Sequence, residues 1–314
     1  MPVPLARVVR SGLEESIHLG SVVVADAAGR VVAVAGDPGR VTYLRSVWKP
    51  LQAAASLARI GDLPLSEREV AVMAASHNAE PIHLEAVRGL LERAGLDESA
   101  LRCPPDRPID PDPDRPPEPP SPLMHNCSGK HAGMLLACVR AGLDLGSYLD
   151  PAHPLQGEIL ELTGAAAGAP AAAVGVDGCG APAAALPLSG IATAFARLPE
   201  GLGPSAARVV EAMRAEPYLV AGRGRVCTAL MEASGAVIAK VGAEGTAGAA
   251  VLGRGMGVAV KVEDGAGRAR DAALVRALAL LDAIDPEPLA SFAAPTVVGG
   301  ARPVGELRAD FSLA

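Results

Sequence analysis

The chain has 314 residues and a formal net charge of −7, and 50% of its residues are hydrophobic although only 2% are aromatic. This length can bury a large core, which must be built from alanine, valine and leucine. The charge and the lack of a basic stripe argue against nucleic acid as a partner, and the lack of an apolar run of about 18 residues argues against a membrane span. The first residues contain no signal-peptide core, so we expect a cytoplasmic protein.

Strand patterns dominate the start of the chain. Residues 6–10, 17–24 and 30–35 are predicted strands, and a turn ending at Gly29 joins the last two in a hairpin. A short extended stretch at 41–44 then leads into RSVWKP at 45–50, which an alanine-rich helical segment follows.

Ser46 and Lys49 stand three residues apart, a spacing that stacks two side chains on one face of a helix. A serine at the start of such a helix can open to a cleft, and a lysine beside it in a dry pocket can lose its proton and serve as a base. A capping serine followed by a surface lysine is the simpler alternative for so short a pattern.

Lysine is scarce in this chain, because only four of the 28 basic residues are lysines: Lys49, Lys130, Lys240 and Lys261. The surplus of alanine, glycine, proline and arginine indicates a GC-rich coding bias, which would turn ordinary surface lysines into arginines. Arginine keeps its charge and cannot act as a base. The retained lysines are therefore candidates for positions that need an amine, with chance retention as the alternative for each.

Helices are predicted at 66–75, where Ser66 and Glu69 form a capping-box pattern, and from Pro81 to about Gly95. The polar segment SHN at 76–78 lies between them. From residue 103 to 122 ten prolines exclude a helix or a central strand. We expect residues 104–122 to form a solvated loop within one domain that spans 1–314, rather than a linker between domains.

The five cysteines include no C-x-x-C pair, and their odd number makes disulfides unexpected. Cys127 precedes a predicted helix at 128–140, with Ser128 as its N-cap candidate, and free N–H groups at such an end favour a thiolate or an anion. A phosphate-binding nucleotide loop is excluded, because the earlier glycine of that motif is missing and neither serine nor threonine follows Lys130. Cys179 lies between two glycines in a predicted turn, and a buried structural thiol is its alternative role.

The second half is predicted as helices and then strands. The helices are expected at 153–164, 188–197, 205–215, 228–233 and 270–284, and the strands at 173–176, 237–241, 249–252 and 257–262. Strands at both chain ends around a helical middle predict an α+β fold, with one antiparallel sheet covered by helices. Lys261, on a returning strand, could face the cleft below the Ser46 helix, whereas Lys240 stays ambiguous between strand surface and site.

Several blocks carry a resemblance. S-x-x-K followed by a lysine on a C-terminal strand is similar to the plan of serine β-lactamases and penicillin-binding proteins. The chain resembles the rhizobial-type asparaginases, the asparaginase II family, more closely. The matching blocks, in the family's order, are RSVWKP at 45–50, SHN at 76–78, HNCSGKHAGM at 125–134, VDGCGAP at 176–182 and the stretch at 240–265. The proline-rich loop departs from the family pattern.

The resemblance implies a serine β-lactamase-like fold, homodimers and hydrolysis of L-asparagine to L-aspartate and ammonia. It implies two serine–lysine pairs, Ser46 with Lys49 and Ser76 with Lys261. It further implies a zinc site with the ligands Cys127, Lys130 and Cys179. A protonated lysine cannot bind zinc, but at a helix N-terminus beside the metal a neutral amine becomes reasonable.

In the expected mechanism neutral Lys49 takes the proton of Ser46, and Ser46 attacks the side-chain amide of asparagine. Ser76 and Lys261 relay protons or supply the alternative nucleophile. Arg45 and Asp177 are the candidates to hold the α-carboxylate and the α-ammonium group of the substrate, and Lys130 is a further substrate-binding candidate; a surface ion pair is the alternative role of Arg45. The zinc is expected to have a structural or substrate-orienting role.

Three other functions stay open from the sequence. A glutaminase would act on a substrate that is longer by one methylene, and such a difference is discriminated only about 10–200-fold. A penicillin-hydrolysing enzyme or peptidase fits the fold but not the expected location. A zinc-dependent amino-acid-binding protein is the non-enzyme alternative, and release of ammonia from asparagine would exclude it.

Overall fold

A computed structural model describes residues 1–109 and 118–314 of the chain. Its main feature is an antiparallel sheet to which both chain ends contribute, in the order β10-β11-β1-β2-β9-β8-β7, with β3 paired to β2. The strands are β1 (Val3–Arg10), β2 (Leu13–Asp26), β3 (Val31–Ala35), β7 (Val237–Val241), β8 (Thr246–Val251), β9 (Met256–Val262), β10 (Thr296–Gly299) and β11 (Arg302–Ala309). The predicted α+β fold class is therefore confirmed.

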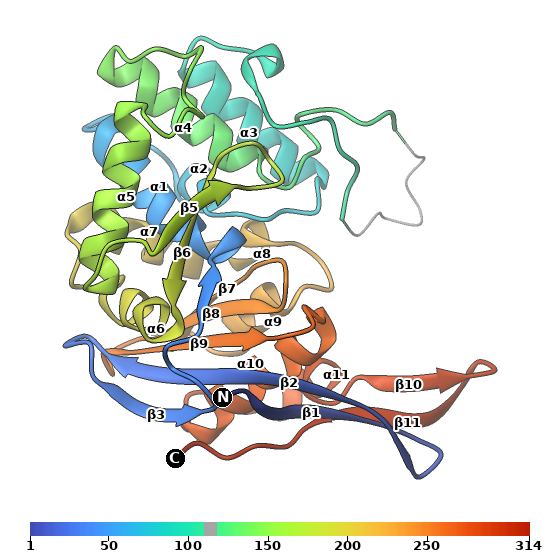
Figure 1. Cartoon of the computed structure of the whole chain (residues 1–314). Coiled ribbons are helices and arrows are strands. Elements are labelled where there is room, and N and C mark those ends of the chain that lie inside the picture. Colours follow the sequence, from blue (N-terminus) through green and yellow to red (C-terminus); the bar gives the residue numbers. More distant parts are fainter. Residues whose placement is uncertain (110–117) are drawn as a thin grey trace.

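Most helices form a layer above this sheet (Figure 1). They are α1 (Lys49–Ile60), α2 (Glu67–Met73), α3 (Pro81–Arg93), α4 (Ser128–Ala141), α5 (Pro154–Ala167), α6 (Leu188–Arg197), α7 (Pro204–Ala215), α8 (Pro217–Val220), α9 (Val226–Ala233), α10 (Gly267–Leu280) and α11 (Ala290–Ala293). Short 3₁₀ turns are η1 (Arg45–Trp48), η2 (Glu98–Ala100) and η3 (Glu287–Leu289). Among the described residues no helix is long and apolar enough to cross a membrane.

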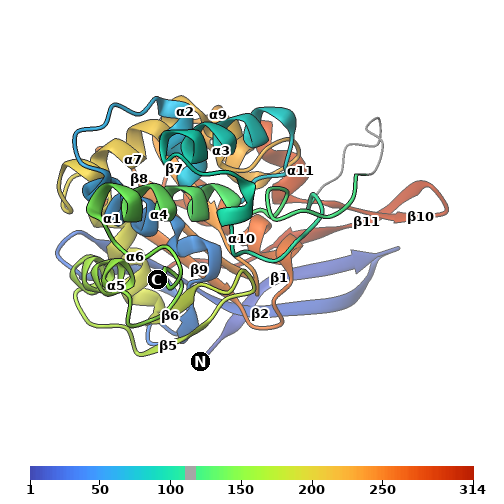
Figure 2. The same cartoon turned by 90° about the horizontal axis from the view of Figure 1, so that it is seen from above.

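Helix α6 packs against β2, β8 and β9, and α1 packs against α4, α5 and α7. Gly248 and Gly257 allow α6 to approach the sheet, because a Cβ atom at Gly257 would lie 2.0 Å from the Ala192 carbonyl oxygen and one at Gly248 would clash with the Phe195 ring. The buried core consists mainly of alanine, valine and leucine, as the composition requires. Figure 2, viewed from above, shows α1 and α4 side by side within the helical layer.

Two parts of the architecture differ from the sequence prediction. Strands β4 (Val41–Tyr43), β6 (Pro182–Pro187) and β5 (Ala173–Val176) form a second sheet, in which β6 was not predicted because its alanines and prolines carry no alternating pattern. Residues 285–314, for which no strand was predicted, contain β10 and β11. The register of β11 comes from its pairing with β1, and that of β10 from its pairing with β11, which local sequence does not reveal.

The described parts of the proline-rich loop, 104–109 and 118–122, contain neither a helix nor a strand, and an isolated bridge joins Asp106 to Ser121. The loop was also predicted from the prolines at 111, 113, 116 and 117, and these lie outside the described residues. Residues 104–109 are relevant for function, because they approach the cavity described next.

Candidate active site

A cavity of about 520 Å³ contains most of the candidate residues from the sequence. Its wall includes Arg45, Ser46, Ser76, Cys127, Asp177 and Cys179. Pro104, Pro105, Asp106 and Ile109 of the proline-rich loop complete one side of the cavity. The cavity therefore joins residues from segments that lie more than 130 positions apart in the chain, as the Arg45–Asp177 hydrogen bond with its separation of 132 illustrates.

Ser46 lies in the 3₁₀ turn η1, and the α-helix begins at Lys49, three residues later than the serine. Its half-buried side chain lines the cavity. The preceding Arg45 has a left-handed backbone (φ 50°), a conformation that costs a non-glycine residue about 1–3 kcal/mol. The end of β7 holds this turn in place, since a Cβ atom at Gly242 would lie 3.0 Å from the Leu44 carbonyl oxygen and 3.3 Å from the Ser46 nitrogen.

Ser76 is placed between two buried lysines. Its Oγ lies 2.9 Å from Lys49 Nζ and 2.8 Å from Lys240 Nζ. Lys49 Nζ also donates to the carbonyl oxygens of Ala75 (2.6 Å) and Asn126 (3.2 Å), and Lys240 Nζ donates to that of Val241 (3.2 Å). The result is a continuous Lys49–Ser76–Lys240 chain along which a proton can move.

Burial favours the neutral form of both lysines. Desolvation lowers the pKa of Lys49, and it lowers the pKa of Lys240 to about 7 from the ordinary value of 10.5. A neutral amine has two N–H groups and a lone pair. Two backbone carbonyls occupy the N–H groups of Lys49, so its lone pair is available to accept a proton from a serine hydroxyl.

The predicted pairing of Ser76 with Lys261 is wrong, because the lysine that bonds Ser76 is Lys240. Lys261 lies on β9, which β8 separates from β7, so two inter-strand spacings of together about 10 Å lie between the two lysine positions. Lys261 Nζ instead donates to the carbonyl oxygens of Glu244 and Val262. It does not line the cavity.

A local signal for Lys240 was present in the sequence. Residues 240–242 read Lys-Val-Gly, which matches the K-T-G pattern of a lysine strand in β-lactamases except for valine at the middle position. By register Lys240 pairs with Gly248, which pairs with Ala259, so Lys240 lies on the sheet face that α6 covers. That face is directed toward the helical layer and hence toward Ser76.

The fold brings Arg45 and Asp177 together at the cavity, and the two side chains form an ion pair with each other. Arg45 Nε donates to Asp177 Oδ1 at 2.7 Å, and both side chains are mostly buried. Asp177 Oδ1 also accepts from the Gly178 N–H at 2.8 Å. Asp177 therefore faces the cavity as a fixed carboxylate, and the ion pair offsets the charges of Arg45 and Asp177 alike.

Cys127, Lys130 and Cys179 converge at the N-terminus of α4, and all three side chains are at least 96% buried. Cys127, rather than the predicted Ser128, is the N-cap, because the Ser128 hydroxyl donates to the Leu123 carbonyl oxygen instead. Lys130 Nζ lies 3.0 Å from Cys179 Sγ. The hydrogen bond from Cys127 and the nearby Lys130 charge outweigh burial and lower the pKa of Cys179, which favours its thiolate form.

His131 also helps to lower the pKa of Cys179. The Tyr148 hydroxyl accepts from the Arg102 N–H at 3.1 Å and lies within hydrogen-bonding distance of His131 Nδ1, at 2.7 Å. The Nε2 atom of His131 is buried and has no partner of ordinary hydrogen-bond geometry among the described residues, yet the ring contributes to the lowered pKa of Cys179. Burial lowers the pKa of His131 to about 4, so the ring is neutral.

The donor set fits the implied zinc ion in its chemistry. Two sulfur donors and a nitrogen donor gather within one buried cluster, and thiolates are usual zinc ligands. Among the described residues no group of three or more His, Cys, Asp and Glu side chains could hold a metal, so a zinc ion here would need the amine of Lys130 as a third ligand. Without a metal, Cys179 and Cys127 raise the pKa of Lys130 against the effect of burial, so zinc would have to displace a proton from this amine. Cys127 and Cys179 also line the cavity, which allows water or substrate to reach a bound ion.

The sequence analysis did not identify several further polar residues of the site. Asn126, Arg225 and Arg270 line the cavity, and the Asn126 carbonyl oxygen accepts a hydrogen bond from Lys49. His77 is buried and joins the Ser76 segment to α4, because its Nε2 lies 3.0 Å from Ser128 Oγ while its Nδ1 accepts from the Ala79 N–H. None of these residues belongs to a motif whose spacing alone indicates a role.

The sequence and the fold match known proteins. The family model described as L-asparaginase II matches residues 6–309. No match was found among curated proteins. Among solved structures, Mglu in its glutamate form is 17% identical over 84% of this chain and 61% of that chain, with a TM-score of 0.50.

Two further solved structures are similar at lower TM-scores. Mglu in its native form is 17% identical over 90% of this chain and 69% of its own length, with a TM-score of 0.48. A β-lactamase from Mycobacterium bovis is 18% identical over 85% of this chain and 95% of its own length, with a TM-score of 0.46. At such identities a structural likeness concerns the fold alone. The family match covers nearly the whole sequence, and the chain therefore belongs to the L-asparaginase II family of amidohydrolases.

Proposed function

We propose that this amidohydrolase converts L-asparagine to L-aspartate and ammonia, with residues 1–314 acting as a single catalytic domain. The observation that carries the proposal is the Lys49–Ser76–Lys240 chain, whose Ser76 lines the same cavity as Ser46. Two lysines with lowered pKa values supply the base that a serine nucleophile needs at neutral pH. The Asp177 carboxylate supplies a partner for the α-ammonium group of an amino acid.

In the first step Lys49 takes the Ser46 proton while Ser46 Oγ attacks the side-chain amide carbon. The resulting tetrahedral intermediate expels ammonia, which needs a proton on its nitrogen. Ser76 can deliver that proton, since its hydroxyl is hydrogen-bonded to both Lys49 and Lys240, and it takes the proton of the Lys49 ammonium in return, which makes Lys49 neutral again. Water then hydrolyses the acyl-enzyme, with Lys49 again as the base, and Ser46 regains its proton.

Ser76 is the second candidate for the nucleophile, because its Oγ, unlike that of Ser46, contacts lysine amines directly. We favour Ser46, whose half-buried side chain in the cavity wall is more accessible than that of Ser76, which is 4% exposed. Hydrogen bonds to a nucleophile often form fully only when the substrate binds.

Zinc is the cofactor that we propose for the site, held by Cys127, Lys130 and Cys179. Bound there, it would orient the substrate and polarise groups that approach it from the cavity. The residues of this chain would position the ion: the lowered pKa of Cys179 favours its thiolate form, and the His131 ring contributes to this lowering.

The proposed function predicts that the purified protein releases ammonia from L-asparagine faster than from L-glutamine. A coupled ammonia assay on both substrates, with and without a chelator, tests this. Glutamine is the second substrate to compare, since Mglu was crystallised in a glutamate form. Tight binding of asparagine without release of ammonia would favour an amino-acid-binding protein instead.

We also propose a homodimer, which light scattering in solution would test.

Metal content provides a prediction that is independent of turnover. The wild-type protein, expressed with zinc in the medium, is expected to contain about one zinc ion per chain. Cys179→Ser should lose most of this zinc, because serine provides a poor zinc ligand. Mass spectrometry of the metals measures the content, and Cys138→Ser serves as the matched control, since Cys138 is an equally buried cysteine of α4 that lies outside the cluster. Equal zinc in both variants would contradict the assigned ligands.

A further inference from the structure

The cavity contains an arginine whose charge is not neutralised. In the described parts of the chain three arginines line the cavity, namely Arg45, Arg225 and Arg270. Arg45 pairs with Asp177, and Arg270 pairs with Asp271, each at 2.7 Å. Arg225 forms no ion pair with any described residue, and its Nη1 donates to the neutral Asn78 Oδ1 at 2.7 Å.

Asn78 fixes the position of this guanidinium group. Its Nδ2 donates to the Arg223 carbonyl oxygen at 3.0 Å and lies 3.4 Å from Glu80 Oε1, so its Oδ1 must be the atom that accepts from Arg225. Gly222 allows the chain to pass close by, because a Cβ atom there would lie 3.0 Å from Asn78 Nδ2. The arginine is therefore held by a rigid amide rather than extended freely into solvent.

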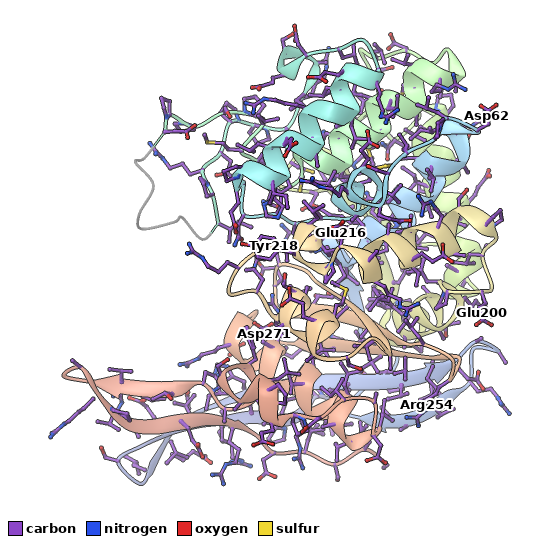
Figure 3. All side chains as sticks on the ribbon, turned by 180° about the vertical axis from the view of Figure 1, so that it is seen from behind. Asp62, Glu200, Glu216, Tyr218, Arg254 and Asp271 are labelled. Carbon is purple, nitrogen blue, oxygen red and sulfur yellow. The ribbon has the colours of Figure 1, made fainter. Side chains whose placement is uncertain are left out.

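The nearby carboxylates are already engaged by other groups. Glu80 accepts hydrogen bonds from the Tyr218 hydroxyl and from the Arg223 N–H. Asp271 accepts from Arg270. Figure 3 shows the labelled Tyr218 and Asp271 near the level at which the helical layer meets the sheet. The protein thus leaves the Arg225 charge to a group that enters the cavity.

We propose that Arg225 binds the α-carboxylate of the substrate. Arginine matches a carboxylate with two parallel N–H groups, and such charge-assisted hydrogen bonds are the strong ones. Asn78 lies two positions after Ser76, so the guanidinium is tied to the same segment as the proton-transfer chain. Asp177 then takes the α-ammonium group, and the two opposite charges fix both polar ends of a small amino acid. This assignment rests on the proposed function.

The proposal moves the carboxylate contact away from Arg45, which the sequence had indicated as the candidate for it. Arg45 is held by Asp177, and its release would leave that buried carboxylate without its partner. Arg225 can bind an anion while its bond to Asn78 persists, since its other N–H groups remain available.

Substrates that lack one charged group test the proposal. Succinamic acid lacks the α-ammonium group of asparagine, and β-alaninamide lacks its α-carboxylate. Arg225→Gln is expected to lower kcat/KM for L-asparagine and for succinamic acid by roughly 10- to 100-fold, mainly through KM, and to leave kcat/KM for β-alaninamide nearly unchanged. Arg225→Lys should recover part of the loss. Arg223→Gln, which removes an equal charge outside the cavity wall, is the matched control and should leave the ratio between substrates unchanged.

An equal loss on all three substrates after Arg225→Gln, or a carboxylate-selective loss after Arg45→Gln instead, would overturn the assignment. Calorimetric titration of the same ligands separates this outcome from failure of the proposed function. If the wild-type protein bound L-asparagine without releasing ammonia, the proposed function would fail, yet selective weakening of asparagine and succinamic acid by Arg225→Gln would still support the carboxylate contact. Equal binding by Arg225→Gln and wild type would refute it.

Discussion

Replacement of Ser46 by alanine is expected to lower kcat for L-asparagine by roughly 10⁴-fold or more, with little change in the thermal midpoint of unfolding. The hydroxyl that forms the acyl-enzyme would be missing, and no neighbouring base could replace it. Because Ser46 is only half-buried, its truncation removes no core packing. Stopped-flow measurement of ammonia release, together with a thermal unfolding curve, checks both parts.

Ser76→Ala is the companion variant, and the covalent adduct distinguishes the two roles. Its kcat should fall by roughly 10²- to 10⁴-fold, because it interrupts proton transfer between Lys49 and Lys240 but keeps the nucleophile. Peptide mass spectrometry after an acid quench should find the aspartyl adduct on Ser46 in the wild type and in Ser76→Ala, and no adduct in Ser46→Ala. An adduct on Ser76 would make Ser76 the nucleophile and Ser46 a supporting residue.

The sequence predicted the sheet formed from both chain ends, because hydrophobic alternation and glycine turns are local signals. Helix α2 begins with the expected capping box between Ser66 and Glu69. The hairpin of β10 and β11 was missed, since its pairing with β1 depends on a partner almost 300 residues away. The same limit applied to β6, whose place between β4 and β5 comes from tertiary pairing.

The candidate site shows a similar division. Sequence motifs identified Ser46, Ser76 and the converging Cys127 and Cys179, all of which line the cavity. They did not decide which lysine reaches Ser76, because Lys240 and Lys261 lie on the same face of neighbouring parts of one sheet. Only the strand order places Lys240, and not Lys261, beside Ser76. Arg225 has no motif at all, and its role follows from the pairing of the other charges.

Lys240→Met is expected to lower kcat by roughly 10²- to 10⁴-fold and at the same time to stabilise the fold. The buried amine has a pKa of about 7 in the folded chain against an ordinary value of 10.5, chiefly because of desolvation. Between these two pH values the unfolded chain binds more protons, so stability rises with pH. The loss of folding stability caused by burying the Lys240 amine is complete below pH 7 and absent above pH 10.5. Methionine has a similar length and carries no charge, and at pH 7 it should raise the free energy of unfolding by a few kcal/mol.

The pH dependence provides the sharper test of Lys240. In the wild type kcat/KM should rise with pH through about 7, as Lys240 becomes neutral, and denaturant unfolding should show stability that rises above the same pH. Lys240→Met should lose the slope in stability. Lys261→Met, the same replacement on β9, should keep the rise of kcat/KM with pH and most of the activity. Among the described residues, the Lys261 amine donates to the backbone carbonyls of Glu244 and Val262 and not to Ser76. If Lys261→Met abolished turnover while Lys240→Met preserved it, the Lys49–Ser76–Lys240 chain would not be the route of the proton.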